Sequence, residues 1–324
     1  MKYLVVTGGA GFIGANVVKR LNELGEEAII IVDNLGSSEK WKNLVDLRFE
    51  DYIHKNKFID DIKSGLFKNS VKAIIHLGAR SSTTEKDVEF LMENNYEYTK
   101  TLAIWSIENN ARFIYASSAA TYGDGSLGFS DNHSLILSLR PLNAYGYSKQ
   151  IFDCWALRNG LLDKVVGLKY FNVYGPREGH KGDMRSMVLK AYEQIKRDGK
   201  IRLFKSYNPN YRDGEQLRDF IYVKDAVDMT LFFLEHADKN GIFNVGTGIP
   251  RSWNDLANSV FSALGMKPNI EYIDMPEVLR GKYQYYTKAD ISKIKSAGYD
   301  AETISLEEAV RDYVINYLEK GIFS

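Results

Sequence analysis

Three glycines near the start of the chain, Gly8, Gly11 and Gly14, constrain its fold more than any other feature. A short apolar run over residues 3–6 precedes them, and residues 12–18 follow with helical spacing, so the pattern predicts a buried strand, a tight turn and a helix. Such a turn binds anions, because free backbone N–H groups and the positive end of the helix dipole converge there. Gly8 permits the turn, Gly11 lets the backbone approach a pyrophosphate, and Gly14 lets the helix pack closely on the strand.

A second predicted strand, residues 28–32, ends at the carboxylate of Asp33, nineteen residues after Gly14. An acidic residue at about this distance accepts a hydrogen bond from the ribose in nicotinamide-dinucleotide sites, so the sequence predicts such a site. The alternative is that Asp33 only caps the strand. Lys40, seven residues further on, could meet a 2′-phosphate and favour NADP over NAD, or it could be a solvated loop lysine.

The charge balance and the cysteine count exclude several classes of function. Lys+Arg and Asp+Glu are equal at 42 each, so no overall field attracts nucleic acid or an anionic membrane, and a diphosphate ligand needs local cations. The only cysteine, Cys154, permits no internal disulfide, which favours a reducing compartment. No apolar run approaches the ~18 residues of a membrane span, and a strand that begins at residue 3 leaves no room for a signal peptide. We therefore expect a cytoplasmic protein.

Strands and helices alternate through the first half of the chain, which predicts an α/β fold with a doubly wound parallel sheet (Rossmann) covered on both faces. A length of 324 residues indicates about two domains. We expect residues 40–70 to be polar and irregular. The further strands and helices predicted in this half are residues 71–79, 88–109, 111–118, 143–159 and 165–171.

After about residue 177 the alternation weakens, and we expect a smaller, discontinuous α/β substrate domain over residues 178–324. Residues 1–177 then form the dinucleotide-binding domain, together with returning segments near 219–250. In these segments, residues 219–223 and 241–245 are expected to be strands of the main sheet. The remaining predicted elements are an extended stretch at 201–204 and helices at 184–197, 225–235, 252–264 and 304–319.

The motif Tyr145-x-x-x-Lys149 carries the predicted chemistry. On a helix these side chains lie one turn apart on one face, so the ammonium group can stabilise a tyrosinate and lower the tyrosine pKa from about 10 toward the range of a general base. Ser118, at the end of the preceding strand, could hold the substrate oxygen whose proton Tyr145 removes. Two other Tyr-x-x-x-Lys pairs occur in the chain, so the spacing alone also fits a helix-surface pair, whereas the order of glycine turn, serine and tyrosine favours catalysis.

In this order the motifs resemble the extended short-chain dehydrogenase/reductase family, which includes the NAD-dependent epimerases and dehydratases, over nearly the whole chain. Within that family, residues 7–14, 81–85, 116–123 and 170–182 are most similar to the 6-epimerases of ADP-heptose, which supply the heptose of bacterial lipopolysaccharide core. The resemblance implies a nucleotide-sugar epimerase that inverts C6 of ADP-D-glycero-D-manno-heptose to ADP-L-glycero-D-manno-heptose through a transient ketone, with bound NADP, or NAD in its place. It also implies a homo-oligomer, commonly a pentamer.

The resemblance implies roles for individual residues. Tyr145 and Lys181 each serve as the base for one epimer. Ser118 hydrogen-bonds the reacting oxygen, and Lys149 tunes Tyr145. Lys181 could instead be a phosphate-contacting or solvated loop lysine, and His180 beside it is predicted to be structural.

The predicted contacts form two sets, and no metal site is predicted. The cofactor contacts are Gly8, Gly11, Phe12, Ile13, Gly14, Asp33, Asn34, Lys40, Lys55, Leu77, Gly78, Ala79, Arg80, Ser81, Asn94, Lys149, Val173 and Lys181. The substrate contacts are Ser118, Asn172, Asp183, Lys190, Phe204, Lys205, Ser206, Tyr207, Arg218 and Tyr283. Arg218 and Lys190 supply local cations for a diphosphate.

Two departures from the family pattern concern these contacts, and there are alternatives to the 6-epimerase function. The loop 206–216 is longer than its family counterpart, and Arg80 stands where a smaller residue can stand. A UDP-hexose 4-epimerase remains open as an alternative. A 4,6-dehydratase is disfavoured, because Ala119-Ala120 follows Ser118 where dehydratases place an acidic pair. A non-catalytic dinucleotide-binding regulator is disfavoured, because such proteins usually lose the tyrosine or the lysine.

Overall fold

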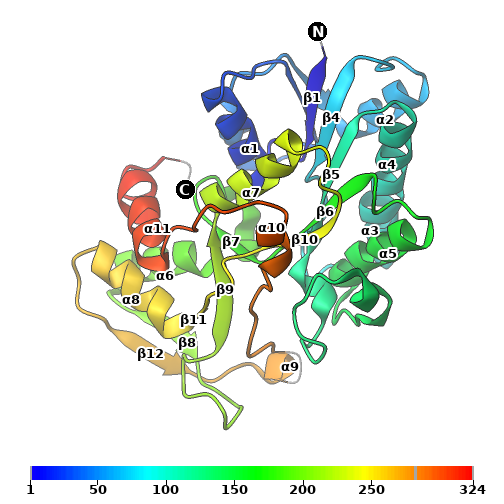
Figure 1. Ribbon diagram of the computed structural model, residues 1–324. Helices are drawn as coiled ribbons and strands as arrows, with labels where there is room; N and C mark the ends of the chain where they lie inside the picture. Colours follow the sequence, from blue (N-terminus) through cyan, green and yellow to red (C-terminus); the bar gives the residue numbers. More distant parts are fainter. Residues whose placement is uncertain (1, 281–282, 323–324) are drawn as a thin grey trace.

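The structure, a computed structural model, describes residues 2–280 and 283–322 and is built on a main sheet of seven parallel strands (Figure 1). The order across the sheet is β10-β6-β5-β4-β1-β2-β3, which confirms the doubly wound α/β fold. This order reverses direction between β1 and β4, and ligands of open α/β sheets bind beyond the carboxyl ends of the strands at such a point. The strands are β1 (Tyr3–Thr7), β2 (Ile29–Asp33), β3 (Asp51–His54), β4 (Val71–His76), β5 (Arg112–Ser118), β6 (Val165–Tyr170) and β10 (Gly241–Val245).

Helices cover both faces of the main sheet, because successive side chains of its strands point into two different apolar cores. In β1, Leu4 and Val6 pack in the core beneath α1 and α7, whereas Val5 packs in the core beneath α2, α4 and α5. Strands buried on both faces are continuous apolar runs, which is why the sequence revealed them. The covering helices are α1 (Phe12–Glu23) and α7 (Val223–Glu235) on one face and α2 (Lys55–Lys63), α4 (Tyr98–Glu108) and α5 (Ala144–Arg158) on the other.

The other strands form two small sheets beside the main sheet (Figure 1). One has the order β11-β9-β7, and the other pairs β12 with β8. Apolar side chains of α6, α8 and α11 continue the core that lies beneath α1 and α7. The strands are β7 (Asn172–Tyr174), β8 (Ile201–Phe204), β9 (Leu217–Tyr222), β11 (Pro250–Ser252) and β12 (Ile270–Ile273). The helices of this part are α6 (Met187–Asp198), α8 (Trp253–Ala263), α9 (Glu277–Arg280), α10 (Ser292–Ser296) and α11 (Leu306–Tyr313).

The expectation that residues 219–223 return to the main sheet is wrong. The strand forms as β9, but it pairs with β7 and β11 in a small sheet, whereas β10 joins the main sheet beside β6. Because β5 pairs with one edge of β6 and β10 pairs with the other, no edge of β6 remains for β9. The apolar composition of a strand reports its burial and does not name its partner.

The expectation that residues 40–70 are irregular is also wrong. A 3-10 turn (Glu39–Leu44), β3 and α2 occupy most of this segment. β3 is an edge strand that buries only Ile53, and α2 buries Phe58 and Ile62, so the apolar signal is sparse. Polar side chains face solvent on both elements, which makes the segment look like a loop in the sequence.

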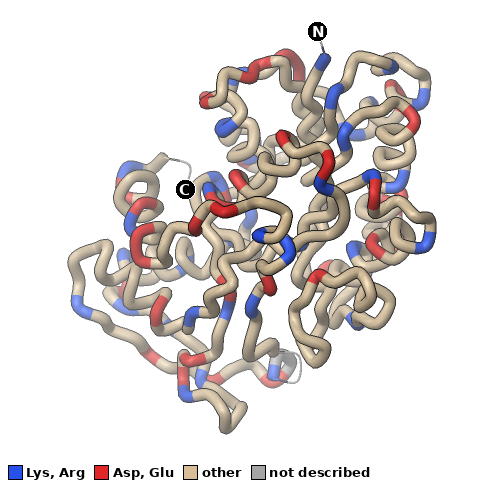
Figure 2. Tube along the Cα trace, in the orientation of Figure 1, with Lys and Arg blue, Asp and Glu red and all other residues tan. Residues whose placement is uncertain are grey.

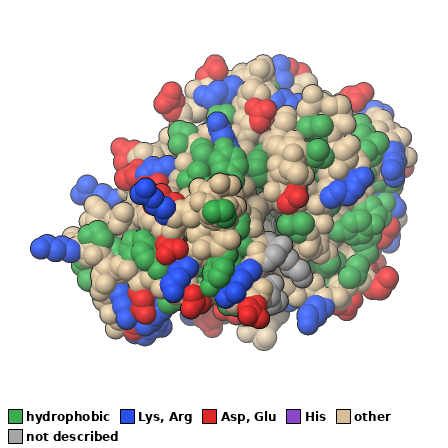
Figure 3. Space-filling view, turned by 90° about the horizontal axis from the view of Figure 1, so that it is seen from below, with side chains coloured by type: hydrophobic (Ala, Val, Ile, Leu, Met, Phe, Trp, Pro, Cys, Tyr) green, Lys and Arg blue, Asp and Glu red, His purple; other side chains and the backbone are tan. Residues whose placement is uncertain are grey.

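Charges of both signs are dispersed along the chain (Figure 2). Seen from below, basic side chains stand beside acidic ones with apolar side chains between them, and no large patch of one sign covers this face (Figure 3). None of the helices in the described part of the chain combines the length and apolarity that a bilayer crossing needs. The charge pattern therefore offers only local sites for anionic ligands.

Candidate active site

The glycine turn between β1 and α1 forms a cradle that side chains would fill. Gly8 has φ +67°, a conformation that suits glycine. A Cβ on Gly8 would lie 2.6 Å from the backbone N of Gly78 at the end of β4, and a Cβ on Gly14 would lie 2.1 Å from the carbonyl O of Gly8. The backbones of β1, α1 and β4 therefore meet without side chains, as close approach of a pyrophosphate to the start of α1 requires.

Beside this turn lies a hollow of about 240 Å³, called the cofactor hollow below. It brings together nine of the predicted cofactor contacts: Gly8, Asp33, Asn34, Lys40, Lys55, Gly78, Ala79, Arg80 and Asn94. Sequence reasoning missed the other four lining residues, Thr7, Val32, Phe90 and Tyr98. Phe90 and Tyr98 stand four residues before and after Asn94, so helical spacing around Asn94 could have found them. The predicted contacts Ile13, Leu77 and Val173 instead pack against the apolar core.

Three cations and one carboxylate stand in the cofactor hollow. The Nζ atom of Lys40 lies 2.6 Å from Oδ1 of Asp33, and Oδ2 of Asp33 accepts a hydrogen bond from the backbone N–H of Ala10 at 2.9 Å. Lys55 donates a hydrogen bond to Asn94 (2.9 Å). Arg80 pairs with Glu85 at 2.9 Å on the surface, so its long side chain does not crowd the turn.

Ser118, Tyr145 and Lys149 meet at the carboxyl edge of the main sheet. Ser118 ends β5, and α5, which carries the other two, begins where the Asn143 side chain accepts a hydrogen bond from the backbone of Gly146. The Ser118 side chain stands beside the Tyr145 hydroxyl group, whose pKa it lowers. The structure thus brings three predicted catalytic side chains to the edge that also holds the glycine turn.

The expected effect of Lys149 on Tyr145 stays a prediction. Burial raises the pKa of Tyr145, and the Ser118 side chain beside it opposes that shift. Burial also lowers the pKa of Lys149 itself, to about 8, with Asp153 opposing the shift. The motif spacing predicted which face the two side chains share, but desolvation, which the motif does not encode, dominates the pKa of both groups.

Lys181 lies next to the start of α1. It stands on a 3-10 segment (Gly179–Met184), and its Nζ atom is 5.1 Å from the centre of the Phe12 ring. Burial lowers the pKa of Lys181, and Glu178 opposes this shift. Burial likewise lowers the pKa of His180 to about 4, and its Nδ1 lies 3.3 Å from the Asn43 side chain. His180 is therefore neutral at physiological pH.

Arg218 forms the centre of the predicted diphosphate contacts. It is buried on β9, with its guanidinium carbon 5.2 Å from the ring centre of Tyr283 and 5.6 Å from that of Trp253. The Trp253 indole donates a hydrogen bond to the Tyr283 hydroxyl (2.8 Å). Burial lowers the pKa of Arg218, and the groups that oppose the shift are the hydroxyls of Tyr283 and Tyr211 rather than a carboxylate. A buried guanidinium among aromatic rings suits a phosphate group. No sequence motif singles out Trp253.

The remaining predicted substrate contacts divide into two groups. Phe204 ends β8, and Tyr207 beyond it donates a hydrogen bond to Asp274 (3.0 Å). Within the long loop 206–216, Tyr211 stacks on Tyr285 with ring centres 5.6 Å apart, so the loop folds back onto the segment after α9. The second group consists of Asn172, Asp183 and Lys190. In this group, Nζ of Lys190 donates a hydrogen bond to the carbonyl O of Asp183 at 2.6 Å. Asn172 and Asp183 are exposed.

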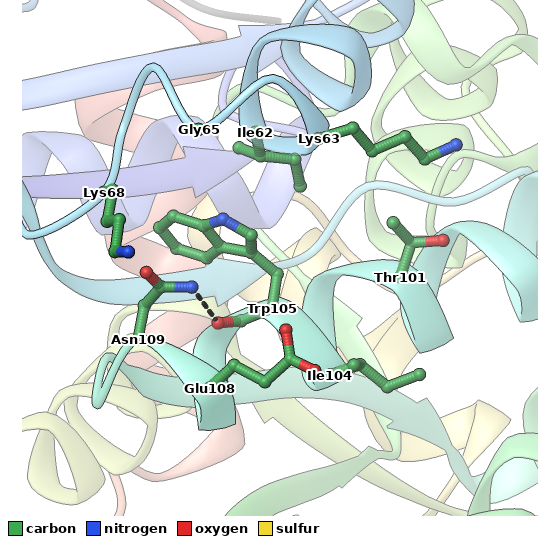
Figure 4. Close-up of a pocket in the computed structure, with 9 residues that line it drawn as sticks. All are labelled: Ile62, Lys63, Gly65, Lys68, Thr101, Ile104, Trp105, Glu108 and Asn109. Atoms are coloured by element: carbon green, nitrogen blue, oxygen red, sulfur yellow. Dashed lines mark hydrogen bonds between the residues drawn. The ribbon is translucent and has the colours of Figure 1, made fainter.

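A second, larger hollow lies away from these residues (Figure 4). It has a volume of about 480 Å³ and lies between the end of α2 and the outer face of α4, where Trp105 and Asn109 line it. None of the predicted site residues lines it. In the described ranges, His, Cys, Asp and Glu side chains form no group of three or more that could hold a metal ion.

Comparison with known proteins gives consistent results. Residues 4–246 match the NAD dependent epimerase/dehydratase family. The chain is 56% identical over 314 residues to a protein of Nitratidesulfovibrio vulgaris named ADP-L-glycero-D-manno-heptose-6-epimerase, with 97% of each chain covered. A protein of that name from Fusobacterium nucleatum is 48% identical over 326 residues, with 98% of each covered. The solved structure of the Helicobacter pylori ADP-L-glycero-D-manno-heptose-6-epimerase has a TM-score of 0.82 at 30% identity, covering 97% of this chain and 96% of that chain.

Proposed function

Since the chain belongs to the NAD dependent epimerase/dehydratase family, we propose that it is an epimerase that inverts C6 of ADP-D-glycero-D-manno-heptose, giving ADP-L-glycero-D-manno-heptose. The observation that carries the reaction type is that Ser118 stands beside the Tyr145 hydroxyl group at the sheet edge that holds the glycine turn. The 56% identity over 97% of the chain supports the choice of substrate.

The glycine cradle and the cofactor hollow fit a nicotinamide dinucleotide. The turn around Gly8 would hold the pyrophosphate, and Asp33 with Lys40 would hold the adenosine ribose. When bound, the nicotinamide supplies a hydride acceptor and, once reduced, a hydride donor. We choose NADP over NAD because Lys40 and Lys55 outnumber the single carboxylate of the hollow.

The proton steps belong to Tyr145 and Lys181. Tyr145 takes the proton of the C6 hydroxyl group while Ser118 holds the oxygen, and a carbonyl group forms at C6. Because C6 is outside the sugar ring, rotation about the C5–C6 bond presents the other face of the carbonyl. Lys181, whose pKa is lowered by burial, then returns a proton to the oxygen. In the reverse direction, Tyr145 and Lys181 exchange these roles.

The nucleotide end of the substrate would bind among the small sheets. Arg218 and Lys190 supply the positive charge that the diphosphate needs. The segment from Phe204 to Tyr207 and the ring of Tyr283 surround that position. We also propose that the protein is a cytoplasmic homo-oligomer, a pentamer by family resemblance. Light scattering measures the mass of the oligomer.

The decisive experiment uses substrate labelled with deuterium at C6. We expect NMR spectroscopy and mass spectrometry to show inversion at C6 with the deuterium retained and no net consumption of NADPH, because hydrogen that leaves C6 returns to C6. UDP-glucose is the parallel substrate, and we expect no inversion at its C4. Turnover of UDP-glucose without turnover of the heptose would identify a 4-epimerase instead.

A further inference from the structure

Two buried charges, Asp153 on α5 and Lys169 on β6, belong to none of the predicted sites. Asp153 is 0% exposed and Lys169 is 1% exposed. The Nζ atom of Lys169 lies 2.8 Å from Oδ2 of Asp153, so the pair joins α5 to β6.

Neutral groups complete the surroundings of both charges. Oδ2 of Asp153 also accepts a hydrogen bond from the Ser117 hydroxyl at 2.7 Å, and Oδ1 accepts one from the Tyr115 hydroxyl at 2.9 Å. Lys169 donates a second hydrogen bond to Oγ1 of Thr121 at 2.5 Å. Ser117 and Tyr115 lie on β5 and Thr121 on the turn after it, so the cluster ties α5, β5 and β6 together.

Stability alone is a weak reason for such a pair. The cost of removing two charges from water offsets their attraction, and apolar residues of similar volume are often as stable or more stable. The position of the pair indicates another role. Asp153 stands four residues after Lys149, which places the two one turn apart on the same face of α5. Ser117 immediately precedes Ser118, whose side chain stands beside the Tyr145 hydroxyl group.

We propose that Asp153, fixed by Lys169, is a positioning residue that keeps Lys149 an ammonium ion during the reaction. Its hydrogen bond to Ser117 also fixes the strand end at which Ser118 presents its hydroxyl group. The inference rests on the proposed function for its enzymatic readout alone.

The electrostatic surroundings agree with this role. Burial lowers the pKa of Lys149 to about 8, and Asp153 raises it. Among the described residues, the other titratable groups that face Asp153 or Lys149 are His76 on β4, Tyr115 on β5, Tyr122 and His133 on 3-10 turns, and Tyr145 and Cys154 on α5. Burial lowers the pKa of the two histidines and raises the pKa of the tyrosines and of the cysteine, so all of these groups are neutral at pH 7. Asp153 is therefore the charge of this cluster that acts on Lys149.

The first test is Asp153→Asn, which keeps the shape and removes the charge. Without the carboxylate, Lys149 loses its proton at lower pH, so we expect the high-pH limb of kcat/KM to move down by about one pH unit while KM stays unchanged. Lysine side-chain NMR, with the Lys149 signal assigned through Lys149→Met, should show the same shift in the absence of substrate. Asp225→Asn is the matched control, because Asp225 is also buried but lies on α7 and accepts a hydrogen bond from Ile304.

Other variants test the role of Asp153 if Asp153→Asn does not fold. If Asp153→Asn does not fold, the double variant Asp153→Leu/Lys169→Met removes both charges and fills the space, and we expect a downward shift there as well. If that variant also fails, Ser117→Ala keeps both charges, and we expect kcat to fall about tenfold through the loss of one hydrogen bond with KM unchanged.

The proposal is overturned if a folded Asp153 variant keeps the wild-type limb and the wild-type Lys149 titration, or if the serine variant becomes the test and keeps the wild-type kcat. A wild-type protein that does not convert the heptose contradicts the proposed function instead. In that case the NMR titration still tests the role of Asp153, because it needs no substrate.

Discussion

Replacing Lys40 by methionine should remove the preference for NADP over NAD. Lys40 lies 2.6 Å from Asp33, whose carboxylate is 6% exposed and also accepts a hydrogen bond from the backbone of Ala10. A 2′-phosphate at this position meets the carboxylate of Asp33, and Lys40 is the cation of the described residues that pairs with this carboxylate. Methionine keeps the length and the apolar stem of the side chain, so the substitution removes the charge with little change in packing.

The size of the effect follows from the interaction that is lost. A hydrogen bond to a charged group contributes about 1.5–3 kcal/mol, and about 1.4 kcal/mol corresponds to a tenfold change in affinity. We therefore expect Lys40→Met to weaken NADP binding by roughly 10- to 150-fold. NAD has a hydroxyl group at this position, and Asp33 can still accept a hydrogen bond from it. The affinity for NAD should therefore change by less than about threefold.

Calorimetric titration of nucleotide-free protein with each dinucleotide measures both numbers. Lys42→Met is the control, because Lys42 is an exposed lysine of the same 3-10 turn and pairs with Glu39 rather than with Asp33. An equal loss for NAD and NADP would mean that the substitution damages the hollow as a whole. An unchanged NADP affinity would refute the assignment of Lys40 to the 2′-phosphate.

Three further predictions concern catalysis, folding and pH. Tyr145→Phe should lower kcat by about 10²- to 10⁴-fold with cofactor affinity in calorimetry unchanged, and turnover near wild type would contradict the assignment. Gly14→Ala should lower the melting temperature and weaken cofactor binding, because its Cβ would stand 2.1 Å from the carbonyl O of Gly8, and an unchanged melting curve would contradict this. Burial and the nearby Lys293 lower the pKa of His133 to about 4. Between about pH 6.5 and pH 4, His133 is therefore protonated in the unfolded chain but neutral in the folded chain. The free energy of unfolding in urea should therefore fall as the pH drops from about 6.5 to about 4, and His133→Gln should flatten that dependence.

The parts of the fold that the sequence revealed are those whose signal is local. β1 and β2 are apolar up to their last residues, Thr7 and Asp33, because both of their faces are buried, and the glycine turn follows β1 directly. The motif of Tyr145 and Lys149 predicted their shared face on α5, since that depends only on helical spacing. The cofactor hollow then follows from the topology, because parallel strands deliver Gly8, Asp33 and Gly78 to one edge.

What the sequence did not reveal depends on partners far along the chain. β9 has the composition of a main-sheet strand, yet β10 takes the free edge of β6. The ion pair of Asp153 and Lys169 joins a helix to a strand and matches no motif. The pKa of Tyr145 depends on how deeply the side chain is buried, and the spacing of Tyr145 and Lys149 contains no measure of that depth.

The main sheet and a small sheet together determine the position of Lys181. β6 belongs to the main sheet and β7, which follows it almost immediately, belongs to a small sheet, so the chain crosses between them before it reaches Lys181. The buried carboxylate of Glu178 then accepts hydrogen bonds from the backbone of Gly175 (3.3 Å) on one side and from the hydroxyl of Ser186 (2.6 Å) on the other. This closes the segment into a loop and holds the lysine against Phe12 at the start of α1. A candidate base carried by the small-sheet part thereby reaches the glycine turn of the main sheet, so its distance from the bound cofactor depends on how firmly Glu178 closes that loop.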